Sequence, residues 1–336
     1  MTDDDAGPVG RAAVRRRPGW VDAVDDRPVL LVVLGMLLFS LGPVLVGVST
    51  GSGAVLSFYR LWIGAAVLGV AVLWRRRSHP LVVSRRGWRW AALAGVAFGT
   101  HQLLFMVAIK ATSVVDVTLM QVIAPVLVGV LARVLFGERP GAAFRLWSAL
   151  AVAGAGVVVV AGTAGPDGEP AGMALALANV VFGAFYVVWS KRAMSHIGAL
   201  PFLFGVGVVA ASTVSVYVLL AGEPVAAVAG RDVLIAAAIA VVPGVLGHFL
   251  TTYPLSRVPA NIPPVVQLAM PFIAGGLAWL LLGERITWLH VLGGTLSIAG
   301  VVGALLSPGG RRLREASRAG AQQPVGRSSG TGRTRT

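Results

Sequence analysis

A few polar residues stand inside long apolar stretches, and their types suggest ligand binding. Gln121 and Gln267 each precede a proline by four positions, in the pairs Gln121/Pro125 and Gln267/Pro271. Proline lacks an N–H and clashes with the carbonyl four residues earlier, so each pair should leave a free carbonyl and an amide side chain at one level. Pro125 and Pro271 are therefore predicted to be hinges. The two glutamines are expected either to contact a substrate or to hydrogen-bond a neighbouring helix.

Two histidines provide titratable groups within the same kind of stretch. His101 and His248 are both far from the ends of their apolar segments, and histidine titrates near neutral pH. Both are candidates for proton coupling, and His101 is also a candidate for substrate binding. A neutral buried histidine that hydrogen-bonds a neighbour is the structural alternative. Further residues that would give a cavity an aromatic and weakly polar lining are Phe39, Ser40, Asn179 and Tyr186.

Two charged residues fall within or at the edge of apolar stretches. Arg60 lies early in one stretch and Asp116 begins another, and both are predicted on the same side of the membrane. Ionisable groups in a membrane are costly and are functional candidates by default, although an arginine near a helix end can extend to the interface. An ion pair between Arg60 and Asp116 is predicted, with substrate recognition by Arg60 as the alternative.

Membrane helices must position these residues. The chain has 336 residues, of which 56% are hydrophobic and 12% charged, whereas soluble domains carry about 25% charged residues. Backbone polar groups in lipid need internal partners, and uninterrupted apolar stretches do not fit the alternating strands of a barrel. The predicted fold class is an all-α membrane protein with about ten transmembrane helices of about 20 residues, at 29–48, 54–73, 90–109, 114–136, 143–163, 171–190, 199–220, 233–253, 260–282 and 289–307.

The two halves of the chain repeat. A shift of 146 positions places residues 121–139 on 267–285 with nine identities in 19, including Gln, Pro and the triplet Gly-Glu-Arg. Each half holds five predicted helices, so the second half must insert upside down relative to the first. Inverted repeats are common in secondary transporters, which bind substrate near the midplane. The predicted domains are a first five-helix repeat at 29–163 and a second at 171–307, between disordered tails at 1–28 and 308–336.

The basic residues predict the orientation. Of the 28 lysines and arginines, 23 fall on the side of the termini, three on the other side and two within helices. The positive-inside rule therefore predicts a multi-pass protein of the cell (inner) membrane with both termini cytoplasmic. The net charge of +14 is assigned to this bias, so nucleic acid is not expected as a partner.

The sequence resembles the EamA-type branch of the drug/metabolite transporter superfamily over roughly residues 29–307. The resemblance rests on Pro125…Gly137-Glu138-Arg139, Pro271…Gly283-Glu284-Arg285, Phe58-Tyr59-Arg60-Leu61-Trp62 and Lys110-Ala111-Thr112-Ser113. It implies ten helices in two inverted five-helix repeats, a central cavity, and alternating access without ATP hydrolysis. It also implies outward movement of metabolites such as amino acids or toxic compounds. The two Gly-Glu-Arg triplets are expected to cap helices and pair loops.

The predicted function is a secondary transporter that exports a small metabolite, amino acid or drug-like compound. An intramembrane enzyme acting on lipids, a passive channel and a membrane scaffold are the alternatives. The sequence has no cysteine and no phosphate-binding, zinc-protease or nucleophile-elbow motif. No enzymatic activity, catalytic residue, metal or cofactor is therefore expected. The expected partners are a small-molecule substrate and the lipid bilayer. Gly95 and Gly99 would allow close helix packing, either within the monomer or in a homodimer.

Overall fold

The computed structural model describes residues 28–77, 84–136, 141–163, 169–247, 250 and 268–307. Within these ranges the chain forms helices and no strand, and nine helical stretches are long and apolar enough to cross a membrane, beside one shorter apolar helix. The elements are α2 (Pro28–Val48), α3 (Gly53–Arg76), α4 (Arg85–Ala111), α5 (Val114–Met120), the 3₁₀ turn η1 (Gln121–Ile123), α6 (Ala124–Phe136), α7 (Ala142–Thr163), α8 (Pro170–Met194), α9 (Ala199–Leu220), the 3₁₀ turn η2 (Val225–Ala227), α10 (Gly230–Val241), the π-helical stretch η3 (Val242–Gly247), α13 (Met270–Leu282) and α14 (Trp288–Leu306). The predicted all-α membrane class is confirmed.

The described residues cover the predicted tails and the ninth predicted helix only in part. The predicted tails lie outside the described residues, except that α2 begins at Pro28. The ninth predicted helix, 260–282, is described only from Leu268, and Leu268 and Ala269 form a turn before α13. Pro271 therefore lies in the first turn of α13 and not inside a continuous helix. The missing N–H of proline has no intrahelical partner at that position, which explains why proline is tolerated there.

Serine residues determine where several helices begin. Ser52, Ser84 and Ser113 directly precede α3, α4 and α5. The hydroxyl of each serine accepts a hydrogen bond from the backbone N–H three residues later. A serine at this position satisfies one of the four N–H groups that have no partner within the helix. These helix starts are thus determined by local sequence.

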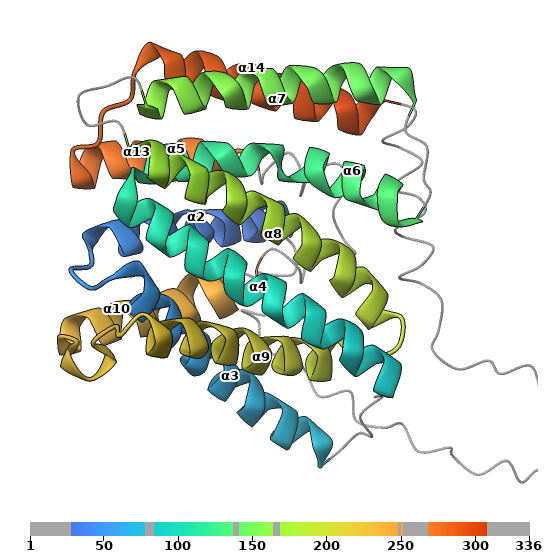
Figure 1. Cartoon of the computed structure of the whole chain (residues 1–336), viewed down its shortest axis with the longest axis vertical. Helices are drawn as coiled ribbons and strands as arrows, with labels where there is room; N and C mark the ends of the chain where they lie inside the picture. Colours follow the sequence, from blue (N-terminus) through green and yellow to red (C-terminus); the bar gives the residue numbers. More distant parts are fainter. Residues whose placement is uncertain are drawn as a thin grey trace, which may run out of the picture.

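The two repeats meet through equivalent helices. Figure 1 shows α7 beside α14 at one edge of the molecule and α3 with α9 at the opposite edge. α7 and α14 are the last helices of their repeats, and α3 and α9 are the second helices. The remaining helices lie between these two pairs. In both pairs, a helix of the first repeat contacts the equivalent helix of the second. A two-fold axis that relates the repeats explains this arrangement, because a helix can contact its own equivalent only where it lies near the axis.

Residue contacts between α7 and α14 support the same axis. A Cβ atom added to Gly154 would lie 2.7 Å from the carbonyl oxygen of Gly293, and one added to Gly300 would lie 2.7 Å from the carbonyl oxygen of Trp147. Trp147 and Gly293 are equivalent under the shift of 146, as are Gly154 and Gly300. Each contact is therefore the image of the other, as expected for repeats that are related by an axis in the membrane plane.

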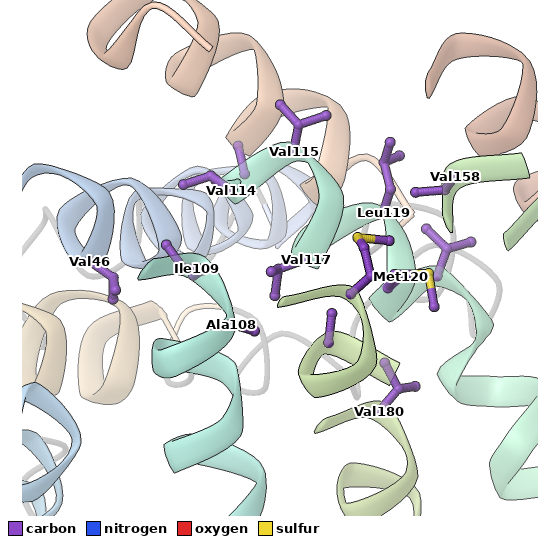
Figure 2. Close-up of a cluster of buried hydrophobic side chains, with 14 of the residues drawn as sticks. Val46, Ala108, Ile109, Val114, Val115, Val117, Leu119, Met120, Val158 and Val180 are labelled. Atoms are coloured by element: carbon purple, nitrogen blue, oxygen red, sulfur yellow. The ribbon is translucent and has the colours of Figure 1, made fainter. Parts of the chain in front are cut away.

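A buried apolar cluster joins helices of both repeats. Figure 2 shows part of it, with Leu119 and Met120 of α5 gathered in one cluster with Val158 of α7 and Val180 of α8. Elsewhere, small residues allow close approach of helices. A Cβ added to Gly99 would lie 2.7 Å from the carbonyl oxygen of Ala210 in α9. The Gly95 and Gly99 pattern is thus used within the monomer.

The loops on one side of the molecule are joined by polar contacts. We call this side the Glu284 face; it holds residues 49–52, 112–113, 221–229 and 283–287. Asp232 accepts hydrogen bonds from the N–H and hydroxyl of Thr50, at 3.0 and 2.7 Å. Ser52 donates to Glu223 at 2.7 Å. The opposite side, which holds the start of α7 and the ends of α3, α6 and α8, is called the Arg145 face.

Candidate functional site

A cavity of about 290 Å³ lies between helices of the two repeats. Four predicted site residues line it, namely Phe39 from α2, Gln121 from η1, Pro125 from α6 and Pro271 from α13. The other described lining residues are Met36, Thr118, Val122, Ala124, Leu268, Met270, Val301 and Leu305. This volume is near the lower end for small-molecule sites. Among the described lining residues, only Thr118 and Gln121 have polar side chains, and none is charged.

The cavity lies at mid-depth in the membrane. Gln121 is seven residues from the start of its span at the Glu284 face, and Pro271 is 11 residues from the end of α13 on that face. A helix rises about 1.5 Å per residue, so these positions lie roughly 10 and 17 Å below the Glu284 face, in a hydrocarbon layer of about 30 Å. Substrate sites between inverted repeats occur at this depth.

A helix break forms one wall of the cavity. α5 and α6 are separated by η1, where the N–H of Ala124 donates to the carbonyl of Gln121. The α-helical donor to that carbonyl would be residue 125, and Pro125 has no N–H. The chain therefore tightens into a 3₁₀ turn, and this turn places the Gln121 side chain at the cavity. Because the break has a covalent cause, it is a built-in feature of this helix.

Not all residues predicted on α2 reach the cavity. Phe39 lines it and its ring lies near η3, since a Cβ added to Gly247 would lie 3.4 Å from that ring. Ser40 is fully buried, and its hydroxyl donates to the carbonyl of Met36 at 2.9 Å. The expectation that Ser40 belongs to the lining is not met, because its hydroxyl is turned back onto its own helix.

A second group of predicted residues lies between α4 and α8. The ring Nδ1 of His101 is 2.9 Å from the carbonyl oxygen of Asn179. A carbonyl oxygen only accepts, so Nδ1 carries the proton in this hydrogen bond. The ring of Phe98 lies 4.7 Å from that of Tyr186 and 6.2 Å from that of His101, measured between centroids. His101, Asn179 and Tyr186 thus form one cluster, which is separate from the lining of the cavity.

Asn179 is the most unusual member of this cluster. It is fully buried, and neither its side-chain oxygen nor its nitrogen has a hydrogen-bond partner within the described chain. A buried amide without partners costs about 1–3 kcal/mol. A group that both donates and accepts a hydrogen bond would satisfy it. Asn179 therefore remains a substrate-binding candidate.

A carboxylate from the second repeat caps a helix of the first. Glu284 accepts hydrogen bonds from the backbone N–H groups of Val114 and Val115, at 2.8 and 3.0 Å. These are the first N–H groups of α5, and the positive end of the helix dipole favours the negative charge. Burial raises the pKa of Glu284, and the two N–H groups oppose this effect. The capping role expected of the second Gly-Glu-Arg triplet is present in the structure.

A second carboxylate strengthens the same junction. Asp116 is buried, and its carboxylate accepts from Nε2 of His290 at 3.0 Å and from the Ser113 hydroxyl at 2.6 Å. Nδ1 of His290 accepts from the N–H of Thr287 at 3.0 Å, so the proton lies on Nε2. Both ring nitrogens of His290 are therefore engaged in hydrogen bonds, and the bond to Asp116 joins the two repeats.

The predicted ion pair between Arg60 and Asp116 is wrong. Within the described residues, Asp116 pairs with His290, and no ion pair joins it to Arg60. Arg60 lies within electrostatic reach of His101 instead. The residues on the second repeat decide the partner of Asp116, because the start of α14 is packed close to the start of α5.

His290 is the main residue that the sequence reasoning missed. Its signal was the spacing Thr287-x-x-His290, which resembles a capping box with histidine in the place of glutamate. Gln267 and His248, the remaining predicted residues, lie outside the described residues. No group of three or more His, Asp or Glu side chains that could hold a metal gathers in the part of the chain that the structure describes.

Comparison with known proteins agrees with this architecture. The sequence model of the EamA-like transporter family matches residues 26–161 and 170–306, once for each repeat. The uncharacterized transporter YdfC of Bacillus subtilis (strain 168) is 26% identical over 250 residues, which cover 73% of this chain and 79% of that protein. A solved crystal structure has the same fold, with a TM-score of 0.54 and 21% identity over 86% of this chain and 99% of the other. The chain belongs to the EamA-like transporter family of the drug/metabolite transporter superfamily and is a membrane transporter.

Proposed function

We propose that this protein is a secondary transporter that exports a small neutral or zwitterionic molecule by alternating access. The observation that carries the proposal is the cavity between the repeats, which has the η1 break before Pro125 and the start of α13 at Pro271 in its wall. Transporters of inverted-repeat architecture bind substrate beside such interrupted helices and move one repeat against the other.

The lining suggests the class of substrate. The described lining side chains are apolar except for Thr118 and Gln121, and none carries a charge. A multiply charged molecule would need several buried partners, because burying an unpaired charge is costly. A volume of about 290 Å³ suits a molecule of amino-acid size. Gln121 supplies an amide that can both donate and accept a hydrogen bond.

The polar junction at the Glu284 face acts as a closure in this proposal. Thr118 lines the cavity only two residues beyond Asp116, so the hydrogen bonds of Asp116 and Glu284 lie directly between the cavity and that face. These bonds join the two repeats. They would have to break when the cavity opens toward the Glu284 face.

His101, close to Asn179, is the candidate for proton coupling, since no described residue hydrogen-bonds its Nε2.

The proposed direction of transport, export, is compatible with the orientation that we propose. The start of α2 and the end of α14 lie at the Arg145 face. The sequence assigns 23 of the 28 lysines and arginines to the same side of the membrane, so we assign this side to the cytoplasm. The closed junction at the Glu284 face would then be on the outside. The protein would receive its substrate from the cytoplasm in this state.

Transport in proteoliposomes tests the proposal. Purified protein is reconstituted, and a panel of amino acids, neutral metabolites and small drugs is assayed with and without an imposed pH gradient. We expect Gln121→Ala to reduce uptake of the transported compound at least tenfold. The matched control is Gln102→Ala, a buried glutamine of α4 outside the cavity lining, which should leave uptake within about twofold. Loss of transport in both variants, or in neither, would remove Gln121 from the site. Failure of every compound to cross would contradict the transporter assignment.

A further inference from the structure

A second hollow lies on the outside of the bundle, between α6 and α7. Its volume is about 580 Å³, and its described lining residues are Val126, Val130, Arg133, Phe144, Arg145, Ser148, Ala149, Val152 and Ala153. Val130 and Val152 expose 48% and 50% of their surface, so this groove faces the lipid. It is separate from the cavity between the repeats, since the two share no lining residue.

Two arginines stand at one end of this groove. Arg133 is three residues from the end of α6 and Arg145 is three residues after the start of α7. Both are therefore about 5 Å from the ends of their helices at the Arg145 face, which is the depth of lipid headgroups. Their side chains are exposed, and neither makes an ion pair with a described residue. No described lining residue is acidic.

The deeper part of the groove is apolar. Val126 lies seven residues before Arg133 and Val152 lies seven residues after Arg145, so both are about 10 Å further into the membrane than the arginines. The two helices run in opposite directions, which brings the valines to one level. A bound molecule would thus meet positive charge near the interface and hydrocarbon below it.

Ser148 is a polar residue in the lining of the groove. Its residue is 9% exposed, and its hydroxyl oxygen is buried without a hydrogen-bond partner in the described chain. Most serines of these helices donate to the carbonyl four residues earlier, as Ser212 does to Val208. Ser148 lies one turn deeper than Phe144 and less than one turn from Arg145. Its hydroxyl oxygen is covered by protein atoms, so we assign it no contact with a bound molecule.

We propose that this groove binds one anionic phospholipid, whose phosphate contacts Arg133 and Arg145 and whose acyl chain lies along Val126 and Val152. We choose this occupant by charge complementarity. Two guanidinium groups at headgroup depth, with no ion-pair partner among the described residues, favour a phosphate. The apolar walls favour a lipid over a soluble anion. The site does not depend on which substrate the protein transports.

Native mass spectrometry of the full-length, delipidated protein tests the proposal. Phosphatidylglycerol and phosphatidylcholine with the same acyl chains are titrated, and glycerol 3-phosphate serves as the soluble headgroup. We expect one phosphatidylglycerol to bind more tightly than phosphatidylcholine. Arg133→Gln with Arg145→Gln should weaken it roughly 25-fold, at about fivefold for each arginine.

The control removes the same charge elsewhere. Arg75→Gln with Arg76→Gln changes two exposed arginines at the same face, at the end of α3 and outside the groove. This variant should keep its affinity for phosphatidylglycerol within about twofold. Equal losses in both double variants would show non-specific attraction and overturn the proposal. Full competition by glycerol 3-phosphate would also overturn the proposal, because the groove would then bind a soluble anion. A dimer that the Arg133/Arg145 variant abolishes would overturn it too, because a second copy of the chain would then occupy the groove. Thermal unfolding without lipid establishes that each variant is folded.

Discussion

Ser297 donates a hydrogen bond to the backbone carbonyl of Ala151 at 3.1 Å, and these residues are 146 positions apart, which is the shift between the repeats. Equivalent residues can touch only where the two-fold axis passes between them. The seam between α7 and α14 is therefore the centre of the repeat architecture. In one half the position holds a serine that donates, and in the other it holds an alanine whose carbonyl accepts.

The close approach at this seam depends on two glycines. A Cβ on Gly154 would lie 2.4 Å from the backbone nitrogen of Ser297, and a Cβ on Gly300 would lie 2.3 Å from that of Ala151. Backbone atoms cannot move aside as a side chain can, so we expect Gly154→Ala and Gly300→Ala each to destabilise the protein by about 1–3 kcal/mol. Thermal unfolding in detergent measures this. Gly156→Ala is the control, because a Cβ there meets nothing within 4 Å and alanine favours a helix by about 1 kcal/mol. Equal destabilisation by all three variants would contradict the close backbone packing of α7 against α14 at Gly154 and Gly300.

The Glu284 cap should contribute to stability. Glu284→Ala leaves the N–H groups of Val114 and Val115 without their acceptor, and loss of a helix cap costs about 0.5–2 kcal/mol. We expect a lower unfolding temperature of the purified protein. Glu169→Ala is a matched control, since Glu169 is exposed beside the start of α8 and its side chain makes no capping bond. If Glu169→Ala lowered the unfolding temperature as much, the effect would come from net charge and not from capping.

The helix break at η1 should matter more for transport than for folding. Pro125→Ala restores an N–H that can donate to the Gln121 carbonyl in an α-helical bond, so the break should partly straighten. We expect unchanged or higher thermal stability together with at least a fivefold slower transport rate. Pro43→Ala, which removes a proline inside α2 but outside the cavity lining, provides the comparison. A transport rate for Pro125→Ala that matches the unmodified protein would rule out a hinge at this position.

The closure at the Glu284 face can be tested by chemical labelling. The natural chain has no cysteine, so a single Thr118→Cys substitution reports on the cavity alone. We expect a membrane-impermeant maleimide to label it slowly from the Glu284 face. Adding His290→Ala removes the hydrogen bond from Nε2 to Asp116 and should increase the labelling rate several-fold. Ser52→Cys, at an exposed site on the same face, should label quickly in both backgrounds. If His290→Ala left the labelling rate at Thr118→Cys unchanged, this bond would not close the cavity.

The sequence by itself determined the features that depend on composition and local spacing. Apolar stretches of sufficient length have to be helices in lipid, the serines at positions 52, 84 and 113 set helix starts, and Pro125 forces a break because it has no N–H. The internal repeat followed from a shift of 146 and needed no structure.

Tertiary structure alone decided which side chains meet. Asp116 pairs with His290, 174 residues away, and not with Arg60. His101 and Asn179 form a cluster apart from the cavity that Gln121 lines. Helix periodicity gives the faces of one helix, but the neighbour of each face depends on how all the helices pack. That packing minimises voids and unpaired polar groups over the whole molecule, so no local pattern in the sequence specifies it.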